Sequence, residues 1–188
     1  LGVLKEAGVE VEFLPVDSAG LIDPDDVSAR LRPTTKLVSV MHANNETGAI
    51  QPLAEVASRL EDHEALLHTD AAQTFGKIEG LSNPRIDLIS ASGHKLYAPK
   101  GIGVLIVRKR DYVRPPISPL LYGGGQERGL RPGTLPVHLC AAFGEACRIA
   151  DTEAADWRRS AASVKESAWE AFQQLGAQIN GPPEGASP

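Results

Sequence analysis

Residues 36–48 read KLVSVMHANNETG, an apolar run that ends abruptly in polar residues. The apolar part, residues 36–41, is typical of a strand buried on both faces of a parallel sheet. In such sheets, ligand-binding groups gather at the carboxyl ends of the strands. The stretch therefore predicts an α/β protein with a functional site directly after this strand.

The same pattern of a short apolar run followed by polar residues recurs along the chain. Residues 66–69 precede Asp70 and Gln73, and residues 87–90 precede Ser92, His94 and Lys95. Further strands are predicted at 9–14 and 103–107, and helices at 25–31 (after an Asp23 N-cap and Pro24), at 53–60, and as one or two helices from 136 to about 175. This alternation predicts a mostly parallel sheet between helices.

Composition excludes several protein classes. The chain has 188 residues, 42% of them apolar and 23% charged, which is typical of a globular protein. Its net charge of −5 and the lack of a basic stripe argue against nucleic-acid binding, and we find no signal peptide and no run long enough to span a membrane. With only two cysteines, a reducing cytoplasm is expected. Because position 1 is Leu and Met41 is the only methionine, we expect a piece of a longer protein.

Asp70 and Lys95 together indicate a particular cofactor chemistry. A partly desolvated lysine is nucleophilic towards an aldehyde and forms a Schiff base. Pyridoxal phosphate (PLP) is the aldehyde cofactor that uses such a lysine, and it needs a carboxylate facing its ring nitrogen, which Asp70 can supply. Ser92 and His94 could bind its phosphate. A solvated surface lysine is the alternative for Lys95, and Lys77 and Lys100 are rival positions for the Schiff base, Lys100 the stronger.

Other patterns receive structural interpretations, and we expect no metal site. His63 and His68 are five residues apart, about 140° around a helix, so they could not share a metal ion there. Cys140 and Cys147 fall on one face of a predicted helix and are interpreted as buried apolar residues. The glycine-rich residues 123–129 lack P-loop and dinucleotide-binding spacing, which indicates a flexible loop near a ligand or subunit boundary.

Four motifs resemble those of cysteine desulfurases, which are fold-type-I PLP enzymes in the class-V aminotransferase group. They are HANNETGAIQP (42–52), HTDAAQ (68–73), SASGHKLYAPKGIG (90–103) and GGGQERGLRPGTLP (123–136). The resemblance implies that Lys95 is the Schiff-base lysine and Asp70 the partner of the pyridine nitrogen. It also implies that Asn45 and Gln73 bind the phenolic oxygen, that Ser92 and His94 bind the phosphate, and that Thr134 reaches the phosphate of the other subunit of a homodimer.

The resemblance further implies a reaction. Sulfur would leave L-cysteine, giving L-alanine and an enzyme persulfide, and would pass to an acceptor protein for iron–sulfur cluster or thio-cofactor assembly. A selenocysteine lyase, a class-V aminotransferase and a truncated non-catalytic PLP-domain module are the alternatives.

The resemblance also implies what this chain lacks. We expect residues 1–148 to be the central part of the large PLP-binding domain, truncated at both ends, and residues 149–188 to be a linker helix and the start of the small domain. The sulfur-accepting cysteine would lie beyond position 188, so neither Cys140 nor Cys147 would take its role. The chain alone is then expected to be inactive.

Overall fold

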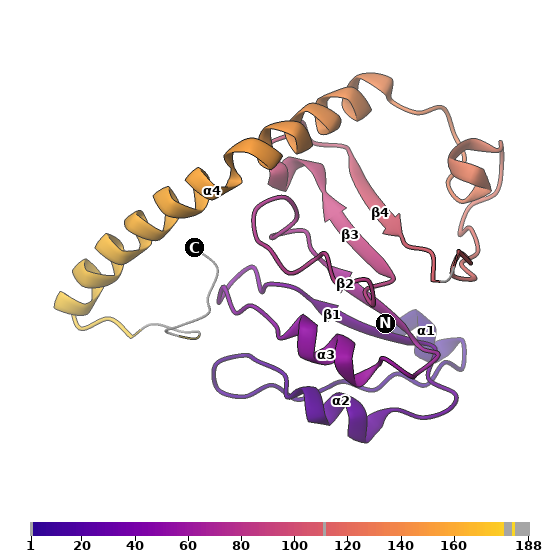
Figure 1. Ribbon diagram of the computed structural model, residues 1–188, viewed down its shortest axis with the longest axis horizontal. Helices are drawn as coiled ribbons and strands as arrows, with labels where there is room; N and C mark the ends of the chain where they lie inside the picture. The colour runs from indigo at the N-terminus through magenta and orange to yellow at the C-terminus, as the bar shows by residue number, and fades with distance from the viewer. Residues whose placement is uncertain (1, 111, 179–181, 183–188) are drawn as a thin grey trace.

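The computed structural model describes residues 2–110, 112–178 and 182. Within them, a four-stranded sheet forms in the order β1-β2-β3-β4, which is also the order along the chain (Figure 1). The first three strands are parallel and β4 is antiparallel to β3, so the prediction of a mostly parallel sheet is confirmed. The strands are β1 (Leu37–Met41), β2 (Leu66–Asp70), β3 (Leu88–Ser92) and β4 (Gly103–Val107).

Two of the helices cover one face of this sheet (Figure 1). Apolar side chains of α2 and α3 pack onto Val40, Leu67 and Ile89, which alternate with outward-facing residues along their strands. This layer is the main core. The helices are α1 (Gly2–Glu6), α2 (Pro24–Arg30), α3 (Leu53–Arg59) and α4 (Val137–Gln174), with two short 3-10 helices, η1 (Gly93–Leu96) and η2 (Gln126–Gly129).

Local sequence explains where α2 and α3 begin and which face they bury. The Asp23 carboxylate accepts a hydrogen bond from the Asp25 amide at 2.9 Å, which satisfies one of the free donors of the first turn of α2. In α3, Leu53, Val56 and Ala57 lie on one side of the helix and are buried, as a helical spacing of three and four residues requires. Both helices therefore form where the sequence predicted them.

Helix α4 is one continuous element of 38 residues, which crosses η1 and runs past that end of the sheet (Figure 1). Ala146 and Ala150 of α4 pack onto Leu96 and Ala98, which gives a second, smaller core. The helix passes through residue 148 without a break, and residues 179–181 and 183–188 lie outside the described residues. In the described ranges, none of the helices is long and apolar enough to cross a membrane.

The opposite face of the sheet is open over much of its area. Leu37 is 52% exposed, Met41 39% and Leu105 50%. The prediction that residues 36–41 are buried on both faces is therefore wrong within the described residues. The strand forms as predicted, but β1 is an edge strand and α2 and α3 cover one of its faces only.

The predicted strand at residues 9–14 does not form. Among the described residues, no strand pairs with this segment to complete a hydrogen-bonded ladder, and Val9 and Phe13 remain 48% and 64% exposed. Alternating apolar residues identify a segment that could pair, and pairing also needs a free sheet edge within reach. The predicted strand at 87–90 forms as β3, which starts one residue later, at Leu88, and ends two residues later, at Ser92.

Asp87 is the centre of a buried ionic cluster. Its carboxylate accepts hydrogen bonds from Arg85 at 2.7 Å, from Arg110 at 2.8 Å and from the Leu67 amide at 2.7 Å. Arg85 also donates to the carbonyls of Leu60, His63 and Ala65. Burial lowers the pKa of Arg85, Arg110 adds to that shift, and Asp87 opposes it. The cluster thus joins the end of α3, the start of β2, and the chain beyond β4.

We predict that Asp87→Asn destabilises the protein by about 3–5 kcal/mol, because two neighbouring guanidinium groups lose the carboxylate that compensates them in a buried place. Urea unfolding monitored by circular dichroism measures this loss. Glu145→Gln is the matched control, since it breaks an exposed pair with Arg148 and should leave the unfolding free energy nearly unchanged. Equal unfolding free energies for the two variants would contradict this account.

Candidate functional site

The ends of β1, β2 and β3 meet at one edge of the sheet. Met41 pairs with Asp70 and Asp70 with Ser90 in the parallel register. Beyond the strands, the His42 amide donates to the Asp70 carbonyl at 2.8 Å, and the Ala71 amide donates to the Ser90 carbonyl at 2.9 Å. The three loops that follow these strands therefore start side by side.

The loop after β1 is a compact turn organised by Asn44. The Asn44 side-chain oxygen accepts hydrogen bonds from the amides of Glu46 (2.8 Å) and Thr47 (3.0 Å). This Asx turn leaves Asn45 at its tip, exposed. Beneath the loop, buried His42 is hydrogen-bonded through Nδ1 to the Thr74 hydroxyl at 2.9 Å, which ties the first loop to the second.

Asp70 ends β2 with its side chain exposed on the open face of the sheet. Its Oδ1 accepts a hydrogen bond from the Ala72 amide at 2.9 Å, which fixes the direction of the carboxylate. On the same face, His68 is hydrogen-bonded to Ser39 at 2.8 Å and to Ser90 at 2.9 Å, so a chain of polar side chains crosses three strands behind Asp70. Sequence reasoning did not find this chain, because strand register alone creates it.

The loop after β3 is the short helix η1, which carries His94 and Lys95. Ser92 Oγ and His94 Nδ1 lie 2.9 Å apart, so two polar groups converge at the start of this turn. A Cβ on Gly93 would lie 2.9 Å from the Ile102 carbonyl oxygen, which explains why glycine is needed between them. Lys95 is half-buried in the turn.

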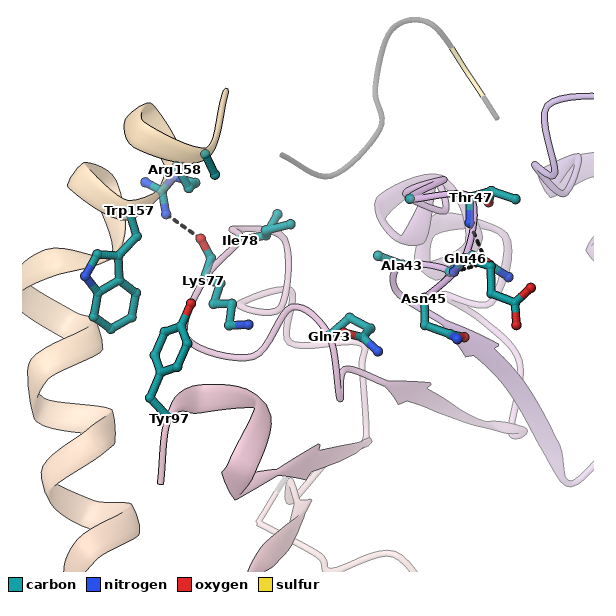
Figure 2. Close-up of a pocket in the computed structure, with 13 residues that line it drawn as sticks. Ala43, Asn45, Glu46, Thr47, Gln73, Lys77, Ile78, Tyr97, Trp157 and Arg158 are labelled. Atoms are coloured by element: carbon teal, nitrogen blue, oxygen red, sulfur yellow. Dashed lines mark hydrogen bonds between the residues drawn. The ribbon is translucent and has the colours of Figure 1, made fainter. Parts of the chain in front are cut away.

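An open cavity of about 430 Å³ lies between the loop after β1 and helix α4 (Figure 2). Asn45 and Gln73 line it, as predicted for two residues of one site. Figure 2 shows that Lys77, Tyr97 and Trp157 form the opposite wall. The other lining residues are Ala43, Asn44, Glu46, Thr47, Gly48, Ile78, Arg158 and Ala161.

The structure brings most of the predicted site residues to this edge of the sheet and leaves one outside it. Asp70 and Ser92 are the last residues of β2 and β3, and His94 and Lys95 lie in η1 directly after β3, although none of the four lines the cavity itself. Thr134 lies exposed in the connection between η2 and α4, beyond β4, and its expected contact with a second subunit stays a prediction.

Three groups near the site have displaced pKa values. Burial lowers the pKa of the His42 imidazole. Burial also lowers the pKa of His68, while the negative charge of Asp70 opposes the shift. Burial, and then the positive charge of Lys95, lowers the pKa of Lys77.

Sequence reasoning missed the α4 side of the cavity. Trp157 and Arg158 carry no local motif, and they reach the site only because α4 passes η1. Lys77 was a candidate only as a rival for the cofactor-binding lysine, although its position four residues after Gln73 placed it near the second loop. Among the described residues, no group of three histidines, cysteines or acidic residues is arranged to bind a metal ion.

The two cysteines lie on α4 and do not line the cavity. Cys147 is half-buried and packs against the second core, as interpreted from the sequence. The same interpretation is wrong for Cys140, which is exposed. The buried side of α4 in this region follows Phe143, Ala146 and Ala150, so the first turns of the helix expose Cys140.

Comparison with known proteins identifies related sequences. The chain matches the family described as "Aminotransferase class-V" over residues 2–185. A protein of Arthroderma benhamiae named "Cysteine desulfurase, mitochondrial" is 53% identical over 151 residues, which is 80% of this chain and 30% of that protein. The chain thus spans about a third of the length of this curated relative.

Solved structures also resemble this chain. The crystal structure of DndA from Streptomyces lividans superposes with a TM-score of 0.94 and 46% identity, covering 99% of this chain and 53% of that one. A structure described as SspA in complex with cysteine gives a TM-score of 0.72 and 41% identity, covering 78% of this chain and 42% of that one. The fold-type-I architecture expected from the motifs is therefore confirmed for the part of the fold that this chain spans.

We predict that acidification destabilises the protein through His42 and His68. Because folding lowers the pKa of both imidazoles, the unfolded chain binds more protons once the pH falls below the unfolded value of about 6.5. The free energy of unfolding should be constant above that pH and should decrease as the pH falls towards the lowered folded values. Urea unfolding between about pH 8 and pH 5 measures the slope.

The variant His42→Gln should be less stable at neutral pH, because the buried bond to Thr74 is altered, and should lose stability less steeply on acidification. His138→Gln, on the exposed side of α4, controls for the substitution itself. A slope for His42→Gln as steep as that of the wild-type protein would show that His42 does not contribute.

Proposed function

The chain belongs to the class-V aminotransferase family, and from this premise we propose that the protein containing it is a PLP-dependent cysteine desulfurase. The substrate would be L-cysteine and the products L-alanine and a persulfide on an enzyme thiol. In this reaction the carbon–sulfur bond breaks, a sulfur–sulfur bond forms with the thiol, and a proton takes the place of sulfur on carbon. The name of the Arthroderma relative and the cysteine bound in the SspA structure support the choice of substrate.

The residues present fit PLP, and their donor chemistry is the observation that carries the proposal. One short turn holds a primary amine, Lys95, directly after the Ser92–His94 pair, which offers a hydroxyl and an imidazole to a phosphate. At the same sheet edge, Asp70 keeps Oδ2 without a hydrogen-bond partner among the described residues. An amine, an anion-binding pair and a carboxylate are the groups that PLP needs from a protein.

When bound, PLP supplies an aldehyde for amines and a ring that withdraws electrons from the α-carbon of an amino acid. Lys95 would hold the cofactor through Nζ and would move a proton to or from the substrate. The Asp70 carboxylate would keep a proton on the ring nitrogen. Asn45 and Gln73 would donate hydrogen bonds to the ring oxygen from the cavity side.

We also propose the finer points of this activity. The thiol that receives sulfur would be neither Cys140 nor Cys147, because burial raises the pKa of the Cys147 thiol and because Cys140 lies on α4 outside the cavity. A sulfur-acceptor protein, for iron–sulfur cluster or thio-cofactor assembly, would take the product. Residues 1–148 would belong to the large PLP domain, and residues 149–188 would begin the link to a small domain.

The proposal also covers the oligomeric state of the protein and its location in the cell. A second copy of the chain would contribute its Thr134 to the phosphate site of a homodimer. We propose a cytoplasmic location from the two free cysteines, and the mitochondrial name of the Arthroderma relative defines the competing location.

In the full-length protein that contains this chain, we predict that Lys95→Ala prevents covalent cofactor attachment and slows sulfide release from L-cysteine by about 10²-fold or more. Borohydride reduction of the PLP-loaded protein followed by peptide mapping should find the pyridoxyl group on Lys95. Asp70→Ala should still be labelled at Lys95 but should release sulfide far more slowly, because the ring nitrogen loses its carboxylate.

Lys100→Ala is the matched control, since Lys100 is exposed in the adjoining turn. It should keep both labelling and activity. Pyridoxyl label on Lys100 or Lys77 in the wild-type protein would refute the assignment of Lys95, and release of alanine without sulfide would refute the proposed reaction.

A further inference from the structure

The turn that carries Lys95 ends in an unusual backbone conformation. Tyr97 closes the short helix η1 with a φ of 66°, in the left-handed region that glycine or asparagine usually occupies at the end of a helical turn. For a tyrosine this conformation is unfavourable by itself, so it persists only where the surrounding structure imposes it. A residue held in this way two positions after Lys95 is a candidate for a functional role.

Burial of both neighbours of Tyr97 imposes the conformation. Leu96 is 1% exposed and Ala98 8%, and both pack into the second core with residues of α4. The amides of Tyr97 and Ala98 both donate to the Gly93 carbonyl, that of Ala98 at 3.1 Å. The backbone that follows Lys95 is therefore fixed by packing and by hydrogen bonds.

The Tyr97 side chain is largely exposed, at 72%, but it makes two ring contacts. Its ring meets Trp157 of α4 edge-to-face, with 5.3 Å between the ring centres, and the Lys77 amine lies 5.1 Å from its centre. Figure 2 shows the Tyr97 ring between these two side chains. Trp157 is itself held, because its indole N–H donates to Glu153 at 3.2 Å. The ring thus joins the lysine-bearing turn to α4 and to the loop after β2.

Tyr112 shows that the backbone conformation does not by itself bring such contacts. It has the same φ of 66°, yet its side chain is 94% exposed and makes no aromatic or cation–π contact with any described residue. Glycine would suit either backbone better than tyrosine does. What distinguishes Tyr97 is its pair of ring contacts, made next to the lysine assigned to the cofactor.

We propose that Tyr97 and Trp157 form a clamp that positions Lys95 for covalent attachment of the cofactor. This inference rests on the proposed function, which gives Lys95 that role. In the attachment, Lys95 Nζ forms a double bond to the aldehyde carbon, and the two protons of the free amine leave with the aldehyde oxygen as water. Tyr97 is a positioning residue, because its ring holds the end of η1 against α4. A reacting atom displaced by about 1 Å can lose about 10²-fold in rate, so a fixed turn speeds this step.

The rate of covalent attachment tests the clamp in the full-length protein that contains this chain. Cofactor-free protein is mixed with PLP and trapped with borohydride at timed intervals, and the label on Lys95 is measured. Tyr97→Gly removes the ring and frees the turn to leave the left-handed region, so attachment should slow by about 10- to 100-fold. Tyr97→Phe keeps the ring and should restore the wild-type rate. Tyr112→Gly makes the same change at the same φ and, as the matched control, should leave the rate unchanged.

The partner ring gives a second variant, which leaves η1 itself untouched. Trp157→Leu should also slow attachment, whereas Trp169→Leu, further along α4, should not. Urea unfolding of each variant separates positioning from stability, since Tyr97→Gly relieves an unfavourable φ and should unfold close to the wild-type midpoint. Slower attachment at unchanged stability is the expected result. Attachment rates that fall only in step with stability, in every variant, would overturn the proposal.

Acetylation of lysines gives a readout that needs no cofactor. In the cofactor-free protein, half-buried Lys95 should react with acetic anhydride more slowly than exposed Lys100. Tyr97→Gly should bring the two rates closer together, because the Lys95 amine is no longer held in a fixed turn. Peptide mass spectrometry measures both rates in one sample.

The outcomes separate this inference from the proposed function. If PLP labels Lys95 equally fast in the wild-type protein and in Tyr97→Gly, the clamp is refuted while the function stands. If PLP labels neither protein, the function fails, and the acetylation of Lys95 still decides whether Tyr97 fixes the lysine. Equal slowing by Tyr97→Gly and Tyr112→Gly would also refute the clamp, because the ring contacts of Tyr97 would then have no part in the effect.

Discussion

The Asp87 carboxylate, held between two guanidinium groups, is the interaction on which the rest of the fold depends. Arg85 and Arg110 approach it from different segments, and the Leu67 amide binds it from β2. A buried carboxylate with fewer partners would be strongly unfavourable, so the segments that carry Leu67, Arg85 and Arg110 must all be in place for Asp87 to be buried. Because the cluster lies at the amino-terminal end of β2 and β3, it sets the register that aligns their other ends.

That alignment produces the candidate site at the opposite end of the sheet. Asp70 and Ser90 face each other in register, so the Asp70 carboxylate at the end of β2 and the Lys95 amine in the turn after β3 come to the same edge of the sheet. Stability and chemistry are thus separated along the strands: compensated charges lie at one end, and incompletely compensated charges, Asp70 and Lys77, lie at the other. Such groups are the ones that can bind a ligand, because the protein does not already satisfy them.

Much of this arrangement could be predicted from local sequence. The polar residues after successive strands located Asp70, Ser92 and Lys95 at one edge, because parallel strands in an α/β sheet end on the same side. The N-cap at Asp23 and the buried face of α3 could likewise be predicted from a few neighbouring residues. By contrast, residues 9–14 alternate like a strand but find no edge to pair with, and Cys140 has a helical position without the burial expected for it.

The sequence by itself determined the element order, the strand ends and the residue types of the site, since turn chemistry, capping and apolar periodicity act over a few residues. Tertiary structure alone decided that Trp157 and Lys77 share a cavity and that His68 connects Ser39 to Ser90. It also decided that Asp87, which reads like the first residue of a strand, is a buried ionic centre. These contacts join residues separated by tens of positions, and only strand register and helix packing bring such residues together.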